Sequence, residues 1–126
     1  MNSPRRVRVL IVDRDRRVRQ ALRDMLTAEP DLEICAAAGD TGTALAQVNA
    51  QRPDVALLDV LLPGPAEGLG LVLALHRLGL PVVVLTTAAS LRGQARASGA
   101  AAFLEKDHNL HRIPQALRAA SRPPER

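Results

Sequence analysis

Acidic, hydroxyl and amine side chains stand where four apolar segments of this chain end. These polar residues are Asp13, Asp15, Asp59, Thr86 and Lys106. A carboxylate can attack phosphorus as a nucleophile, and carboxylate oxygens are the ligands that a hard divalent cation prefers. A hydroxyl and an ammonium group can bind the oxygens of a transferred group. Together, these residue types are suited to phosphoryl transfer.

Five short apolar segments alternate with segments of helical period, and these elements must position the polar residues. The expected strands span 7–12, 32–38, 55–60, 81–87 and 101–106. The expected helices span 16–29, 40–51, 89–98 and 109–121. A further helix should follow a turn at 62–70 and end at about residue 77. Strands that are apolar on both faces indicate a parallel sheet covered by helices on both sides. We therefore predict an α/β fold, a flavodoxin-like doubly wound five-stranded parallel sheet of the (βα)5 type.

In such a sheet, ligands bind beyond the carboxyl ends of the strands, so the polar residues should meet in one cleft. Each of them alone has a simpler interpretation. An aspartate can cap a helix or a turn, a threonine can be an ordinary strand residue, and a lysine can be solvated. Their joint placement at one edge of the sheet favours a functional site. Lys106 is also the only lysine beside sixteen arginines, which indicates that a compact point charge is needed there.

The composition limits the classes of function. The chain has 126 residues and a formal net charge of +4, and we expect one domain over 1–121 and a tail or linker over 122–126. Phe103 is the only aromatic residue, so no aromatic platform for stacked bases accompanies the basic charge. No apolar run is long enough to span a membrane, and the first residues do not read as a signal peptide. With Cys35 interpreted as a core residue in a reducing compartment, we expect a cytoplasmic domain that itself binds neither nucleic acid nor membrane.

Three stretches resemble the receiver domains of bacterial two-component response regulators. They are "RPDVALLDVLLPG" (52–64), "LPVVVLTT" (80–87) and "SGAAAFLEKD" (98–107). The resemblance implies that Asp59 is the phospho-acceptor, Thr86 the switch hydroxyl, Phe103 the aromatic switch residue and Lys106 the phosphoryl-binding lysine. Lys106 followed by Asp107 is similar to the subfamily that carries a LuxR-type DNA-binding domain.

The resemblance also implies partners and a cofactor. A sensor histidine kinase or a phosphotransfer protein would donate the phosphoryl group, and the surface formed by 89–98, 101–106 and 109–121 would then switch. Thr86 would move toward the phosphate, and Phe103 would turn inward to fill the space. Mg²⁺ would be held by Asp13, Asp59 and the backbone carbonyl of Leu61, with Asp15 as a further candidate ligand. Separately from the resemblance, the apolar stripe of 109–121 should pack on the sheet, so we expect any homodimer to use the last strand and helix, with Arg112, Arg118 and Arg122 directed outward as a basic rim.

Three features depart from the family pattern, and the first of them is a turn after Pro63 that is one residue longer than usual. Arg14 stands where receivers carry the second of two adjacent acids, so we expect weak Mg²⁺ binding. Two arrangements follow: Arg14 turns into the cleft and pairs with Asp59, or Asp15 turns back and replaces the missing ligand. We favour the first, because a helix that begins near Asp15 would use its carboxylate as a cap. The segment from Thr86 to Gly99 is also about two residues short, which predicts a shortened helix.

Two other functions compete with a phosphorylated, non-enzymatic receiver. One is a pseudo-receiver that binds partners without being phosphorylated, because Arg14 spoils the metal site. The other is a phosphatase, since "IVDRDRRV" resembles the first motif of haloacid-dehalogenase-type enzymes. In that case Asp13 would be the nucleophile and Asp15 the acid/base. The position of the acyl phosphate, on Asp59 or on Asp13, separates the receiver from the phosphatase.

Overall fold

Five strands alternate with helices in a computed structural model that describes residues 5–107 and 110–121. In chain order the elements are β1 (Val7–Val12), α1 (Arg16–Thr27), β2 (Leu32–Ala38), α2 (Thr41–Gln51), β3 (Val55–Leu58), α3 (Pro65–Arg77), β4 (Val82–Thr86), the 3₁₀ turn η1 (Ala89–Leu91), α4 (Arg92–Ala97), β5 (Ala102–Glu105), the 3₁₀ turn η2 (Leu110–Arg112) and α5 (Ile113–Ser121). Among the described residues, no helix is long and apolar enough to cross a bilayer.

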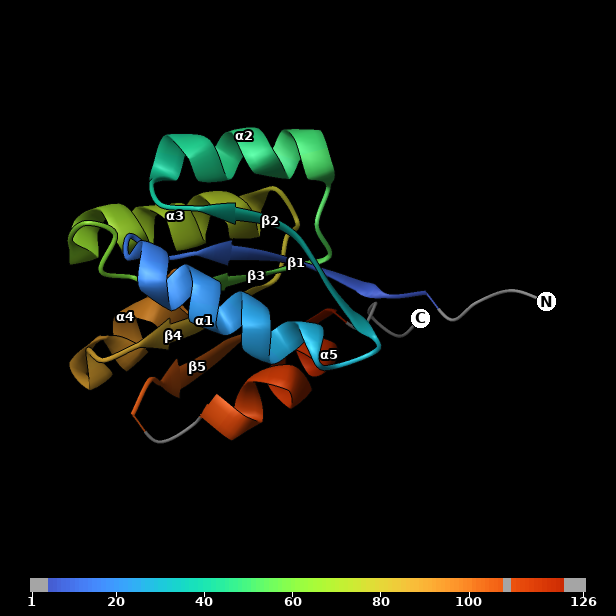
Figure 1. The fold of residues 1–126 in the computed structure, drawn as a ribbon. Coiled ribbons are helices and arrows are strands. Elements are labelled where there is room, and N and C mark those ends of the chain that lie inside the picture. The colour runs from blue at the N-terminus through green and yellow to red at the C-terminus, as the bar shows by residue number, and fades with distance from the viewer. Residues whose placement is uncertain (1–4, 108–109, 122–126) are drawn as a thin grey trace, which may run out of the picture.

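The strands form one sheet in the order β2-β1-β3-β4-β5, and every neighbouring pair is parallel. Helices α1 and α5 cover one face of the sheet, and α2, α3 and α4 cover the other (Figure 1). The predicted flavodoxin-like, doubly wound fold is confirmed. Because all strands run the same way, the carboxyl ends of β1, β3 and β4 lie beside one another at one edge.

Two apolar clusters hold the layers together. Alternate residues of a strand point to opposite faces, so Ile11 packs with Leu22 of α1 and Leu117 of α5, whereas Leu10 belongs to the cluster under α2, α3 and α4. All four residues of β3 are buried. Burial on both faces fixes the register of the central strands, and with it the position of the residues that follow them.

The chain leaves β3 at Leu58, earlier than predicted, and enters α3 at Pro65, where a turn over 62–70 was expected. Proline favours the first helical position because its fixed φ suits the helix and its missing N–H is not needed there. Gly68 then packs its backbone on Val60, so closely that an added Cβ would lie 1.6 Å from the Val60 carbonyl oxygen. This contact holds the start of α3 against the segment that follows β3.

The segment between β4 and β5 is short, as predicted. It contains the turn η1 and a six-residue α4 in place of one helix over 89–98. The expected helix over 109–121 is likewise split into η2 and α5, and residue 109 lies outside the described residues. β5 ends at Glu105, so Lys106 is the first residue beyond that strand.

Candidate functional site

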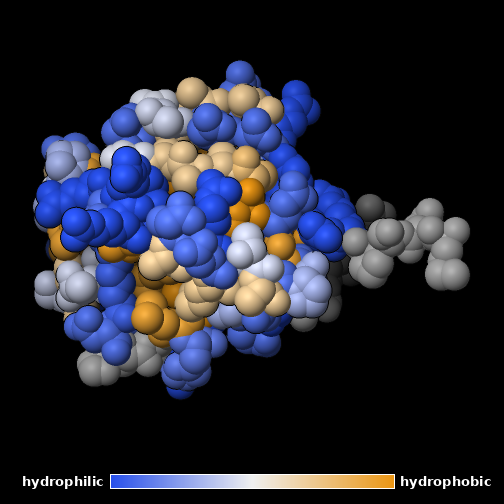
Figure 2. All heavy atoms as spheres, viewed as in Figure 1, coloured by the Kyte–Doolittle hydropathy of each residue, from blue (hydrophilic) through white to orange (hydrophobic). Residues whose placement is uncertain are grey.

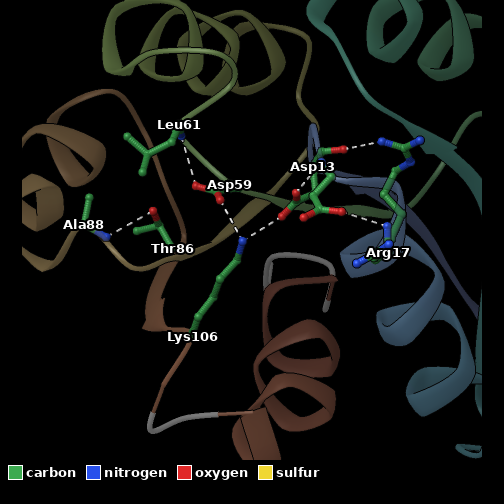
Figure 3. A network of polar contacts seen from close by, with 9 residues as sticks. Asp13, Arg17, Asp59, Leu61, Thr86, Ala88 and Lys106 are labelled. Carbon is green, nitrogen blue, oxygen red and sulfur yellow. Dashed lines mark hydrogen bonds and ion pairs between the residues drawn. The ribbon is translucent and has the colours of Figure 1, made fainter.

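The sheet brings together the side chains of Asp13, Asp59, Thr86 and Lys106 at the carboxyl ends of β1, β3, β4 and β5 (Figure 3). Two backbone hydrogen bonds extend the sheet by one residue at this edge. The Asp13 N–H donates to the Ala38 carbonyl, and the Asp59 N–H donates to the Val12 carbonyl, each at 3.0 Å. The two aspartates are therefore held on neighbouring strands with little backbone freedom.

The Lys106 ammonium joins the two carboxylates. Its Nζ donates to Asp13 Oδ2 and to Asp59 Oδ2, both at 2.8 Å. The side chain of Asp13 is only 4% exposed, that of Asp59 10%, and that of Lys106 19%. Two like charges this far from water would repel each other, and the ammonium between them offsets that repulsion.

The same contacts govern the protonation of Lys106. Burial by itself lowers the pKa of an ammonium, because it disfavours the charged form. Hydrogen bonds and attraction from Asp13 and Asp59 act in the opposite sense and outweigh burial, so the pKa of Lys106 is raised above its usual value. The ammonium is therefore charged at neutral pH and available to bind an anion.

The remaining carboxylate oxygens accept backbone N–H groups. Asp13 Oδ1 accepts from Asp15 at 2.9 Å, and Asp59 Oδ1 accepts from Leu61 at 3.0 Å. Each aspartate thus closes a small turn with the residue two positions later. These bonds fix the orientation of both carboxylates, so that the oxygens facing each other are the ones that meet Lys106.

Within the described residues, the side chains of Arg14 and Asp15 form no hydrogen bond or ion pair with Asp13, Asp59 or Lys106. Asp15 caps α1 by accepting the Arg17 N–H at 2.8 Å, and this capping role was expected. Arg14 is exposed, and the Asp59 carboxylate pairs with Lys106. The favoured expectation, a pair between Arg14 and Asp59, is therefore wrong. The alternative is wrong as well, since the Asp15 carboxylate is turned to the helix.

The cap on α1 also bears on the phosphatase alternative. That mechanism needs Asp15 as an acid/base beside the nucleophile Asp13. In the structure, the Asp15 side chain accepts from the first turn of α1, while the Asp13 side chain is bonded to Lys106. The arrangement therefore does not support the phosphatase mechanism.

Arg19 is a residue of this site that the sequence did not single out. From α1 its guanidinium reaches over to the loop after β1 and donates to the Asp13 carbonyl at 2.7 Å. It occupies the space above Gly39, where an added Cβ would lie 2.8 Å from Arg19 Nη1. A glycine directly after the neighbouring strand β2 is the signal that could have indicated a side chain crossing at this point.

Thr86 is the last residue of β4, and Phe103 lies within β5. Thr86 is fully buried, and its Oγ1 accepts the Ala88 N–H at 3.3 Å. Phe103 is 8% exposed and belongs to the apolar cluster under α2, α3 and α4. We expected Phe103 to turn inward only when a phosphoryl group binds, but the ring is already buried. A phenyl ring has no hydroxyl to hydrate, and the Arg92 guanidinium covers it at 4.8 Å from the ring centroid.

The expected basic rim of a dimer surface is only partly present. Arg112 is exposed, but Arg118 points to the loop before β2, where it binds Asp31 and Glu29. Arg122 lies outside the described residues. The outward placement predicted for Arg118 is wrong, because two carboxylates lie within its reach at the far end of the sheet.

Both carboxylates that could hold a divalent cation at the cleft are already paired with Lys106. Mg²⁺ takes oxygen ligands in near-octahedral geometry and is bound through one or two carboxylates plus water or substrate oxygens. Asp13 and Asp59 supply two carboxylates, and both are engaged by Lys106. Over the described ranges, 5–107 and 110–121, no group of three or more His, Cys, Asp or Glu side chains is placed to hold a metal ion.

Comparison with known proteins assigns the chain to one family. The family model of the response regulator receiver domain matches residues 9–118. The DNA-binding transcriptional activator DevR/DosR of Mycobacterium tuberculosis is 38% identical over 107 residues, which cover 80% of this chain and 48% of that protein. A protein-glutamate methylesterase/protein-glutamine glutaminase of Hydrogenovibrio crunogenus is 37% identical over 106 residues, which cover 80% of this chain and 28% of that protein. The chain thus spans about half or less of these two relatives.

Solved structures support the same assignment. The signal receiver domain of the response regulator NarL from Mycobacterium tuberculosis superimposes with a TM-score of 0.83 at 30% identity, over 94% of this chain and 98% of that one. Receiver domains generally bind Mg²⁺ at an acidic pocket, and they interact with histidine kinases or phosphotransfer proteins. The resemblance found in the sequence is confirmed.

Proposed function

Because the chain belongs to the response regulator receiver domain family, we propose that it accepts a phosphoryl group on Asp59 and relays this event to its α4, β5 and α5 surface. The donor is a sensor histidine kinase or a phosphotransfer protein. The role is that of a phosphoryl acceptor and signalling module rather than of an enzyme with a substrate of its own.

One observation carries the proposal. Lys106 Nζ stands 2.8 Å from both Asp13 Oδ2 and Asp59 Oδ2, with the fully buried Thr86 at the end of the next strand. A nucleophile, a cation and a hydroxyl are therefore gathered at one strand edge, where α/β folds bind ligands. The set matches what phosphoryl transfer requires, which is mainly positioning and charge stabilisation.

Asp59 is the better nucleophile of the two carboxylates. It follows β3, the strand at the middle of the sheet, and its side chain is more exposed than that of Asp13, 10% against 4%. An Asp59 oxygen attacks phosphorus while the bond from phosphorus to the donor breaks. Lys106 then binds an oxygen of the transferred group and keeps its contact with Asp13.

Thr86 supplies the link to the rest of the domain. Its hydroxyl can donate to a phosphoryl oxygen once it rotates away from Ala88, whose N–H it accepts at 3.3 Å. Ala88 directly precedes η1, so this exchange reaches η1 and α4 through the backbone. A local change in charge is thereby converted into a change at an interaction surface.

The proposal extends to partners and place of action. The exposed Leu110 and Arg112 of η2 lie beside α5, and we infer that this region contributes to a homodimer or to a contact with an effector. Cys35 is a free thiol, in keeping with a reducing cytoplasm. Nothing in the site is suited to reading bases, so we assign no nucleic-acid contact to the domain itself.

A pseudo-receiver is the second candidate, and the arginine at position 14 favours it. Arg14 stands next to Asp13 in place of a second acid, so the site lacks one of the carboxylates on which a metal site of this kind depends. In that case the domain would bind its partners in the conformation that the structure shows, with Phe103 already buried.

Labelling with an acyl-phosphate donor and intact mass measurement separates the two functions. The wild-type protein should gain the mass of one phosphoryl group, and Asp59→Asn should gain none. Asp24→Asn is a matched control, because Asp24 lies on α1 away from the strand ends, where it accepts a hydrogen bond from Gln20. Absence of labelling in the wild type under every condition would leave the pseudo-receiver. Equal labelling of Asp59→Asn would remove the acceptor role from Asp59.

A further inference from the structure

The two carboxylates of the site already hold a cation of the protein's own. Asp13 and Asp59 each use Oδ2 to bind Lys106 and Oδ1 to accept a backbone N–H, from Asp15 and Leu61. A divalent ion that bridged both carboxylates would have to displace the ammonium or share its oxygens. Two cations competing for the same oxygens repel each other, and the repulsion is strong where water is scarce.

Among the residues that the structure describes, no third acid joins Asp13 and Asp59 to relieve this competition. Asp15 is occupied as the cap of α1, and the residue between the two acids is an arginine. Arg14 is exposed directly beside Asp13, and Arg16 and Arg17 are exposed on the first turn of α1. Figure 2 shows a strongly hydrophilic surface at this end of α1. The two carboxylates are already neutralised by an internal ammonium, and Mg²⁺ would have to compete with it for the same oxygens beside three exposed arginines.

We propose that Lys106, assisted by Arg14, takes the part of the divalent cation, so that Asp59 accepts a phosphoryl group without a metal. The inference rests on the proposed phosphoryl-acceptor function and adds how its charge is balanced. Lys106 contacts the nucleophile itself and has three N–H donors on one nitrogen. Two of these N–H groups bind Asp13 and Asp59, and the third can bind a phosphoryl oxygen while Lys106 stays in the cleft.

The transfer balances without a further reactant. An Asp59 oxygen forms a bond to phosphorus as the bond between phosphorus and the donor breaks, which is a P–N bond in a phosphohistidine and a P–O bond in an acyl phosphate. The electron pair of that bond leaves with the imidazole or the carboxylate, and solvent supplies the proton that the imidazole takes. The Lys106 ammonium offsets charge on the phosphoryl oxygens, and the exposed Arg14 guanidinium attracts the anionic donor to the cleft.

Phosphoryl labelling with and without metal tests the proposal. Wild type, Arg14→Asp, Arg16→Asp and Lys106→Ala are incubated with an acyl-phosphate donor in excess EDTA or in excess Mg²⁺, and labelling rates are read by intact mass. Arg16→Asp is the matched control, because it makes the same change of charge at an exposed residue just beyond the cleft. The wild type and Arg16→Asp should respond to Mg²⁺ by less than about threefold, and Arg14→Asp by at least about tenfold. Lys106→Ala should lose labelling in EDTA.

A binding measurement that does not depend on labelling accompanies it. The amides of Asp15 and Leu61 donate to Asp13 and Asp59, so their ¹⁵N and ¹H shifts report on both carboxylates. Titration with Mg²⁺ alone should leave these shifts nearly unchanged in the wild type and should move them to saturation in Arg14→Asp. Circular dichroism establishes that each variant is folded.

Different results would refute the metal-free site and the acceptor function of Asp59. Wild-type labelling that requires Mg²⁺, or saturating Mg²⁺ shifts in the wild type, would overturn the metal-free site while leaving Asp59 as the acceptor. Lys106→Ala labelled in EDTA as fast as the wild type would also overturn it. Failure of both the wild type and Arg14→Asp to be labelled even with Mg²⁺ would refute the acceptor function itself, and the inference with it.

Discussion

The guanidinium of Arg92 lies over the ring of Phe103, 4.8 Å from its centroid. Phe103 is buried against the cluster that underlies α2, α3 and α4, and Arg92 is exposed at the start of α4. A cation over an aromatic face is attracted by the ring electrons, and the long side chain also shields the ring from water. The pair therefore connects Phe103 of β5 to the start of α4.

Arg92→Ala should loosen this ring. Loss of the contact should disfavour the buried position by about 0.5–1 kcal/mol, which raises the population of any outward position roughly two- to fivefold. Phe103 is the only Phe, Tyr or Trp residue of the chain, so the proton resonances of its ring are easy to assign. Arg96→Ala, an exposed arginine on the same helix, is the control. Identical ring resonances in Arg92→Ala and wild type would show that Arg92 does not hold the ring.

Binding of a phosphoryl mimic such as beryllofluoride should change Thr86 more than Phe103. Thr86 Oγ1 now accepts the Ala88 N–H, and it must give up this role when it turns to the mimic. We therefore expect a large shift of the Ala88 amide, which Thr86→Ala should abolish, and a small change of the Phe103 ring, which is buried beforehand. A large change of the ring together with an unmoved Ala88 amide would contradict this order of events.

Gly68 should not tolerate a side chain. An added Cβ would lie 1.6 Å from the Val60 carbonyl oxygen, so α3 would have to move away from the segment that follows Asp59. We expect Gly68→Ala to lower the free energy of unfolding by more than about 3 kcal/mol. Gly70→Ala is the matched control on the same helix, where a Cβ meets no heavy atom within 4 Å. That variant should gain about 0.5–1 kcal/mol from helix propensity. Urea unfolding followed by circular dichroism measures both, and equal stabilities would show that the close approach is not required.

Arg118 ties α5 to the loop before β2. It contacts Asp31 through two nitrogens, at 2.6 and 2.9 Å, and its hydrogen bond to the Asp31 side chain is the main reason that the pKa of Asp31 lies below its usual value. A lowered folded-state pKa contributes stability that is present above the unfolded pKa and is lost as the pH falls through the folded one. Arg118→Ala should therefore be less stable than wild type at neutral pH, and the difference should shrink below about pH 4.

Urea midpoints for Arg118→Ala at neutral and acidic pH test this dependence. Arg112→Ala, which removes an exposed arginine of η2, should leave the midpoint almost unchanged at both pH values. A difference between Arg118→Ala and wild type that persists or grows in acid would show that the ion pair is not its source.

The sequence was informative where the backbone decides the outcome. Apolar runs of strand length determine a parallel sheet, and a parallel sheet places the residues that follow its strands at one edge. The grouping of Asp13, Asp59, Thr86 and Lys106 therefore follows from the sequence alone. The cap at Asp15 was also predictable, because a capping aspartate acts within a few residues of its own position.

The partners of long side chains were less predictable. Arg14 was expected in the cleft and is exposed, whereas Arg19 reaches the Asp13 carbonyl and Arg118 reaches Asp31. A guanidinium on a flexible chain can reach several acceptors, and the choice depends on contacts between residues far apart in sequence. The burial of Phe103 was missed for the same reason, because Arg92 covers it from a separate helix.

We propose that the cleft gathered around Lys106 makes Asp59, rather than Asp13, the phosphoryl acceptor. The position of the acyl phosphate in the wild-type chain tests this assignment. The labelled protein is trapped by borohydride reduction and digested, and the modified aspartate is located by peptide mass spectrometry. We expect modification at residue 59 alone. Modification at residue 13, or an unmodified Asp59 in protein that carries the label, would contradict it.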